Sequence, residues 1–106
     1  MSETRVVHLR KEHYDILIDR TTIFGNKYHI GKDSTRAQVI HKHLLWLIEK
    51  LETDLEFKEA LLNLRGKTLG CWCKPLDCHG DNYALYLDKG IEYLYEKRDM
   101  YKEEEI

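Results

Sequence analysis

Residues 67–81 read KTLGCWCKPLDCHGD and decide the fold of this chain. Residues 67–73 combine the β-branched Thr68 with apolar and small side chains, which predicts a strand. Pro75 ends that strand and marks a turn. Residues 77–81 then supply polar side chains of the kind with which helices begin. A strand, a tight turn and a helix in succession are typical of an α/β domain.

The residues before this segment predict further strands. Short apolar runs favour a strand at residues 5–10 and a second strand at residues 15–19. Residues 20–31 contain two glycines and an asparagine without a clean period, which favours an ordered loop with a brief strand at residues 28–30. The strand at 67–73 is expected to be central, because it leads directly into the cysteine-rich segment.

The middle of the chain is predicted to form two helices. Thr35 and Gln38 match a capping box, and the apolar residues that follow at helical spacing predict a helix over residues 35–51. A shorter helix is predicted from about residue 54 to residue 64, and Gly66 closes it.

The last predicted helix opens within residues 77–81 and continues to residue 96. Its apolar face consists of residues three or four positions apart: Ala84, Leu87, Ile91 and Leu94. Residues 97–106 are charged and are expected to fray. The sequence therefore predicts one domain over residues 1–106, with an ordered core at about 5–96. Its fold class is α/β, a small three- to four-stranded, mostly parallel sheet with helices packed on it.

Composition excludes several classes of protein. The chain has 106 residues, a formal net charge of −2 and three cysteines that all lie within residues 71–78. Clustered, odd-numbered cysteines argue against a secreted disulfide scaffold and for a reducing compartment. No run is apolar enough for a signal sequence or a membrane span, so we expect a cytoplasmic protein. The net charge makes nucleic acid an unlikely partner.

The cysteine-rich segment also predicts a binding site. Alternation along the strand places Cys71 and Cys73 on one face and Trp72 on the other. Cys78 and His79 then lie at a helix N-terminus, beyond the carboxyl end of a strand, where α/β proteins commonly bind anions. Gly80 would allow a ligand to approach the backbone closely.

Specific roles follow from these positions. We predict a lowered pKa for Cys78, which would make it a nucleophile, and acid–base chemistry for His79. Asp81 would cap the helix or act as a base. The predicted catalytic residues are Cys78, His79 and Asp81, and the predicted ligand-binding residues are Arg10, Arg20, Asn26, Cys73 and Gly80.

Structural roles compete with these predictions. Cys71 and Cys73 could simply pack in the core. Zinc is a rival, because Cys71, Cys73, Cys78 and His79 would supply four ligands, but their spacing departs from the usual separation of two to four residues. We therefore predict neither a metal nor another cofactor. His41 and His43 are predicted at the surface or its boundary.

Several segments together resemble a known family. They are residues 5–10 (RVVHLR), 14–15 (YD), 18–20 (IDR), 24–26 (FGN), 30–36 (IGKDSTR) and 66–81. They resemble a family of phage and bacterial proteins known as a domain of unknown function, with the motif GKxLxCWCxPxxCHGD. Asp19 and His8 depart from the family's glycine and asparagine, and residues 21–28 depart from its GSxWGNPF loop, so the ligand is expected to differ if that loop selects it. A second α/β family, whose motif ends Cys-His-Arg, has a similar strand–turn–helix segment.

The resemblance implies a phage or bacterial accessory protein, acting in the host cytoplasm if phage-encoded.

Three hypotheses of function fit the residues. The first is a binder of a small anionic ligand, such as a nucleotide or a similar phosphorylated molecule. The second is a transferase or hydrolase that acts on such a ligand through Cys78 or His79. The third is a module that binds a host protein, with a structural zinc or a plain core.

Overall fold

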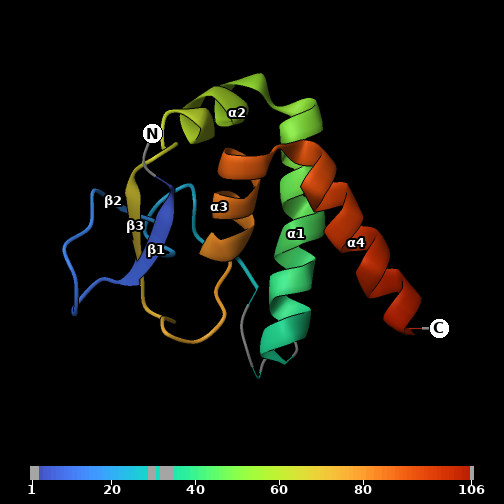
Figure 1. Ribbon diagram of the computed structural model, residues 1–106, viewed down its shortest axis with the longest axis horizontal. Helices are drawn as coiled ribbons and strands as arrows, with labels where there is room; N and C mark the ends of the chain where they lie inside the picture. The colour runs from blue at the N-terminus through green and yellow to red at the C-terminus, as the bar shows by residue number, and fades with distance from the viewer. Residues whose placement is uncertain (1–2, 29–30, 32–34, 106) are drawn as a thin grey trace.

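The computed structural model describes residues 3–28, 31 and 35–105, and only the backbone of residues 101–105. Figure 1 shows a small sheet at one side of the molecule and the helices gathered on the other. The described part of the chain runs β1, β2, α1, α2, β3, α3 and α4. This arrangement confirms the predicted single α/β domain with helices packed on a small sheet.

The sheet consists of β1 (Arg5–His8), β2 (Ile16–Leu17) and β3 (Thr68–Cys71), in the spatial order β1-β3-β2. Both outer strands run parallel to β3. The prediction that this strand is central is therefore confirmed. Each strand is shorter than predicted, and Tyr28 lies outside any strand, while residues 29–30 fall outside the described residues.

Parallel pairing brings the carboxyl ends of the strands to one edge. In the register of β1 with β3, His8 lies opposite Cys71, the last residue of β3. The segments that leave this edge include residues 18–28 after β2 and residues 72–79 after β3. Ligands of open α/β sheets bind at such an edge.

The capping box predicted for α1 (Arg36–Thr53) is confirmed. The Thr35 hydroxyl accepts a hydrogen bond from the Gln38 backbone N–H, and the Gln38 side chain accepts one from the Thr35 backbone N–H. Asp54 follows α1 and caps the N-terminus of α2 (Leu55–Leu62), because its carboxylate accepts a hydrogen bond from the Phe57 backbone N–H.

Among the described helices, none has the length and apolarity needed to cross a membrane.

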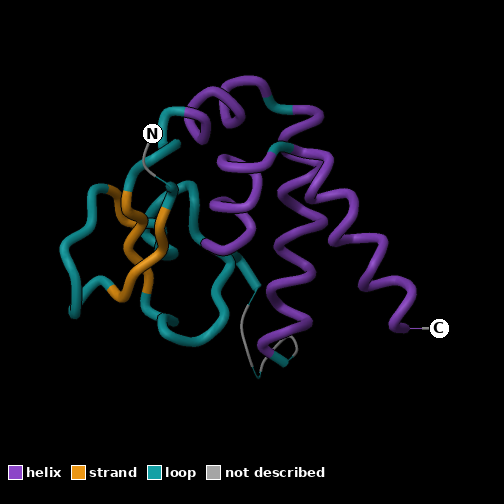
Figure 2. The backbone as a smooth tube through the Cα atoms, viewed as in Figure 1, coloured by secondary structure: helices purple, strands orange, loops and turns teal. Residues whose placement is uncertain are grey.

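The chain after residue 80 forms two helices rather than the one predicted. Figure 2 shows the break between α3 (Gly80–Lys89) and α4 (Ile91–Glu105). Gly90 has φ of 100°, a left-handed conformation that ends α3. The apolar spacing of Leu87 and Leu94 continues across this break, so periodicity alone does not reveal it. The backbone of α4 continues to Glu105 where a frayed tail was predicted.

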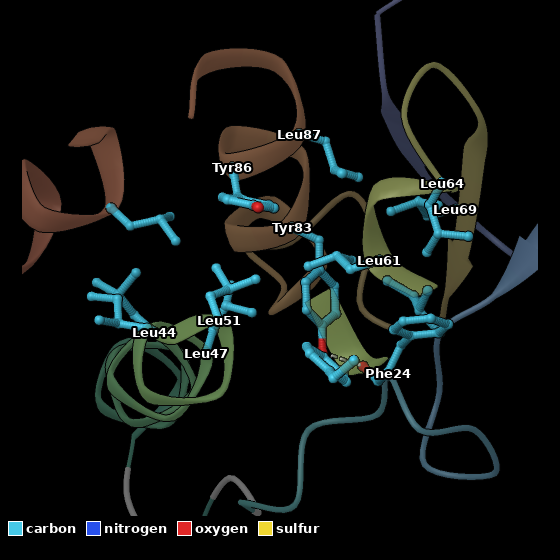
Figure 3. Close-up of a cluster of buried hydrophobic side chains, with 14 of the residues drawn as sticks. Phe24, Leu44, Leu47, Leu51, Leu61, Leu64, Leu69, Tyr83, Tyr86 and Leu87 are labelled. Atoms are coloured by element: carbon cyan, nitrogen blue, oxygen red, sulfur yellow. Dashed lines mark hydrogen bonds between the residues drawn. The ribbon is translucent and has the colours of Figure 1, made fainter. Parts of the chain in front are cut away.

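The core lies between the sheet and the helices. Figure 3 shows Leu44, Leu47 and Leu51 of α1 on one side of Tyr83, and Leu61 of α2 with Leu69 of β3 on the other. Phe24 joins them from the loop after β2, with its ring 6.0 Å from that of Tyr83 in an edge-on arrangement. This loop is therefore anchored in the core, although it has no regular secondary structure.

His43 lies in the core, so the prediction that it is a surface or boundary residue is wrong. Its side chain is 1% exposed, and the Tyr83 hydroxyl lies 3.1 Å from Nε2. Because Tyr83 donates its own proton to the Phe24 carbonyl, His43 must be the donor to Tyr83. Asn82 donates to His43 Nδ1 and accepts from Lys97. Burial lowers the pKa of His43 well below its ordinary value, so the ring is neutral.

Gly80 sets the distance between α3 and the sheet. A Cβ at this position would lie 2.7 Å from Ile18 Cδ1 and 2.9 Å from Val6 Cγ1. We predict that Gly80→Ala lowers the free energy of unfolding by about 1–3 kcal/mol, because the sheet and α3 must separate to admit the methyl group. Urea denaturation measures this change. In an unobstructed helix the same substitution raises stability by about 0.5–1 kcal/mol, so equal or greater stability would contradict this packing.

Candidate functional site

A cavity of about 170 Å³ opens at the carboxyl edge of the sheet. Three segments line it: the loop after β2, the first turns of α1 and the cysteine-rich segment after β3. The lining residues are Asp19, Arg20, Thr21, Asn26, Tyr28, Arg36, Val39, Ile40, Cys71, Trp72, Cys73, Asp77, Cys78 and His79. The cavity therefore lies where the sequence predicted a binding site.

The three cysteines form one cluster on the cavity wall. The Sγ atoms of Cys71 and Cys78 lie 2.7 Å apart, and the three Sγ atoms all lie within 4.8 Å of one another. Alternation along a strand does not cause this proximity, because β3 ends at Cys71 and Cys73 lies in the turn that follows. The chain then returns through Pro75 and brings Cys78 against the end of β3.

Backbone N–H groups point at two of these sulfur atoms. Cys73 N–H donates to Cys71 Sγ at 3.3 Å, and Gly80 N–H donates to Cys78 Sγ at 3.3 Å. The second donor belongs to the first residue of α3, whose N-terminus adds a partial positive charge. These dipoles favour negative charge on the cluster.

The lowered pKa predicted for Cys78 belongs instead to Cys71. The hydrogen bond from Cys78 lowers the pKa of Cys71 to about 6, and the Cys73 N–H contributes further. The same bond raises the pKa of Cys78, since this thiol is the donor, and burial acts in the same direction. The pair therefore loses one proton easily and holds the second.

His79 is held by the loop after β2. Its Nε2 lies 2.8 Å from the Ile18 carbonyl and 3.1 Å from the Phe24 carbonyl. Both partners can only accept, so Nε2 carries the proton and Nδ1, 3.5 Å from Cys78 Sγ, does not. Burial lowers the pKa of His79, which keeps the ring neutral. His79, predicted as an acid–base residue, thus links the loop after β2 to the start of α3 by hydrogen bonds.

Gly80 and Asp81 lie beside the cavity without lining it. Gly80 is buried and packs against Val6 and Ile18, so its small size serves helix–sheet packing rather than ligand approach. Asp81 bonds back to the turn before α3: its Oδ2 accepts from Cys78 N–H at 3.0 Å, and its Oδ1 accepts from Lys74 Nζ at 2.6 Å. The N-cap residue of α3 is His79, and no side chain caps the helix there.

Arg20 and Asn26 shape the loop and line the cavity. Arg20 donates through Nε to the Asn26 carbonyl and through Nη2 to the Tyr28 carbonyl, both at 3.1 Å. The Asn26 side chain accepts from Tyr28 N–H at 3.0 Å. Arg10 does not line the cavity but stacks on Trp72, with its guanidinium 4.8 Å from the ring centre. Three of the five predicted binding residues, Arg20, Asn26 and Cys73, therefore line the cavity.

Sequence reasoning missed Arg36 and Trp72. Arg36 lies in the first turn of α1 and donates from Nη1 to the Asp77 carbonyl at 3.0 Å, which links two walls of the cavity. The family-like IGKDSTR segment, which ends at Arg36, was the available signal. Trp72 is 50% exposed and donates from Nε1 to Asp19. It was assigned to the opposite face because the strand was expected to include it.

Comparison with known proteins supports the resemblance seen in the sequence. The family described as "Domain of unknown function (DUF4326)" matches residues 3–89. The chain belongs to the DUF4326 family. A relative from Enterobacteria phage T4, named "Uncharacterized 12.4 kDa protein in nrdA-td intergenic region", is 34% identical over 97 residues, which cover 91% of this chain and 88% of the phage protein. No solved structure matches. Every residue that lines the cavity lies within the DUF4326 region.

The thiol pair predicts a specific pH dependence. Ultraviolet absorbance of the reduced protein, with a chelator present to remove metal ions, should show one thiolate forming with a midpoint near pH 6, the pKa of Cys71. Cys78→Ala should move that midpoint up towards about 8.5, the ordinary value, because alanine has no hydrogen-bond donor to replace the thiol.

Cys73→Ala is the matched control, and its midpoint should stay closer to that of the unmodified protein, because Cys78 contributes most to the lowered pKa. Absence of thiolate absorbance from the unmodified protein at pH 7 would contradict the described coupling of Cys71 with Cys78.

Proposed function

We propose that this chain binds a nucleotide or a similar phosphorylated small molecule in the cavity at the carboxyl edge of the sheet. The observation that carries the proposal is the pair of guanidinium groups of Arg20 and Arg36. Both line the cavity, and neither forms an ion pair with a carboxylate in the part of the chain that the structure describes.

Arginine suits the phosphate part of such a ligand. The described partners of Arg20 and Arg36 are neutral backbone carbonyls, which orient the two guanidinium groups but do not compensate their charge. A guanidinium presents several N–H donors in one plane and binds phosphate with two hydrogen bonds at once. Two such groups in one cavity favour a phosphate over a singly charged carboxylate.

The remaining walls suit a base and a sugar. Trp72 and Tyr28 supply aromatic faces on which a base can stack, and Trp72 is half exposed. Asp77 adds a carboxylate that can accept hydrogen bonds from sugar hydroxyls. Asp19 is less available for this role, because its carboxylate already accepts from Thr21 and Trp72.

Charge and size favour a small ligand over a nucleic acid. The net charge is −2, yet basic side chains gather near the aromatic walls: Arg10 lies over Trp72, and Lys27 and Lys42 lie over Tyr28. The cavity volume of about 170 Å³ is below the range of about 300–1,000 Å³ typical of drug-sized ligands. These features support a phosphorylated sugar, or a mononucleotide that extends beyond the cavity along the exposed Trp72.

We propose binding rather than turnover. Cys78 is 1% exposed and carries the raised pKa of the thiol pair, and His79 uses its one proton to hold two loop carbonyls. The Cys78 thiol is therefore poorly placed as a nucleophile, and the His79 Nε2–H is engaged and does not serve as a proton donor. A phage encodes the T4 relative, and a phage-encoded binder of this kind would act in the host cytoplasm.

Isothermal titration calorimetry with adenosine and guanosine 5′-monophosphates, cyclic AMP and inorganic phosphate tests the proposal. We expect at least one nucleotide to bind. Arg36→Gln should weaken that binding about tenfold to a hundredfold, the usual effect of losing a hydrogen bond to a charged group. Trp72→Ala should weaken nucleotide binding by a similar factor, since stacking contributes about 1–3 kcal/mol per base.

Lys67→Gln is the matched control. It removes the same charge from an exposed residue just before β3, outside the cavity lining, and should leave the affinity unchanged. Two results would overturn the proposal: no binding of any nucleotide at millimolar concentration, or equal affinities of the Arg36→Gln variant and the unmodified protein.

A further inference from the structure

We infer that Cys71, Cys73 and Cys78 together bind one zinc ion at the wall of the cavity. Their Sγ atoms all lie within 4.8 Å of one another. A tetrahedral zinc ion binds thiolates at about 2.3 Å and so holds their sulfur atoms about 3.8 Å apart. Binding the ion would require the 2.7 Å separation of Cys71 Sγ and Cys78 Sγ to widen towards this value.

The surroundings of the cluster suit bound thiolates. Cys71 Sγ and Cys78 Sγ each accept a hydrogen bond from a backbone N–H, which is the usual way in which proteins orient and stabilise metal-bound sulfur. The N-terminus of α3 adds a partial positive charge next to Cys78. These contacts supply the outer layer of interactions that a metal site requires.

Charge balance also favours a divalent ion. Three thiolates and Zn²⁺ carry a net charge of −1, and Lys74 is the nearby cation that offsets it. Its Nζ forms an ion pair with Asp81 Oδ1 at 2.6 Å. Without the ion the thiols retain protons, and binding of a divalent ion would release them.

The ion would have three protein ligands. Among the described residues, the three thiols form the group whose candidate ligand atoms all lie within 4.8 Å of one another. His79 does not belong to this group. Since all three cysteines line the cavity, the fourth position of the ion would face it. Three protein ligands and one open position are typical of catalytic zinc, whereas structural sites have four.

The spacing that argued against zinc in the sequence is overcome by the fold. The unusual separations are the single residue between Cys71 and Cys73 and the direct adjacency of Cys78 and His79. A three-thiol site does not need His79, whose Nε2–H is bonded to the Ile18 and Phe24 carbonyls. The end of β3 and the turn through Pro75 bring the three sulfur atoms together across separations of one and four residues.

Elemental analysis of the untagged, full-length protein, purified without chelator under reducing conditions, tests this inference. We expect about one zinc ion per chain. Cys71→Ser, Cys73→Ser and Cys78→Ser should each reduce the zinc content to near zero. Leu76→Ser is the matched control: Leu76 lies in the same turn, is exposed and does not line the cavity, so its variant should retain the metal.

A second measurement applies even if a cysteine variant fails to fold. The unmodified protein, stripped of metal and loaded with Co²⁺, should show intense thiolate-to-cobalt absorption in the near ultraviolet and the visible bands of tetrahedral cobalt. Zinc should then protect the three thiols from a thiol reagent. No nucleotide is present in these experiments, so this inference and the proposed function can fail independently.

Three results would overturn the inference. The first is a purified protein that contains no zinc and whose thiols remain fully reactive with stoichiometric Zn²⁺ present. The second is a different metal in place of zinc. The third is a Cys71–Cys78 disulfide in protein isolated without oxygen, because oxidised sulfur cannot bind the ion.

Discussion

The hydrogen bond from His79 Nε2 to the carbonyls of Ile18 and Phe24 is the contact on which the site depends. It joins the first turn of α3 to the loop that follows β2. Tyr83, one turn further along α3, donates to the same Phe24 carbonyl. Together these donors hold the loop against the helix, so that Arg20 and other loop residues face the cysteine cluster and enclose the cavity.

A network of buried polar side chains on α1, α3 and α4 holds Tyr83 in place for this contact. His43 on α1 donates to the Tyr83 hydroxyl, and Asn82 donates to His43 and accepts from Lys97 on α4. Among the described residues, every buried side-chain nitrogen and oxygen has a hydrogen-bond partner. Such a network fixes the tautomer of each ring and links α1, α3 and α4 to the loop. The helices thus serve the site by fixing the loop, while the thiols remain on the cavity wall.

The sequence predicted the fold better than the site. Patterns of residues close together in the sequence predicted the central strand, the parallel α/β class and the Thr35 capping box. The break at Gly90 was missed because apolar spacing continues across it. The roles of His43 and His79 depend on partners about 40 to 60 residues away, which no local pattern encodes. The thiol cluster likewise depends on a turn that brings Cys78 back to β3.

The tautomer of His79 tests the central claim, that a neutral imidazole holds the loop over the thiols. Long-range proton–nitrogen NMR spectra distinguish Nδ1 from Nε2 and report which one carries the proton. Because burial lowers the pKa of His79, we predict a ring that gains its second proton only below the ordinary pKa of about 6.5 and whose neutral form carries the proton on Nε2. A titration midpoint at or above 6.5, or a neutral ring with its proton on Nδ1, would contradict the account.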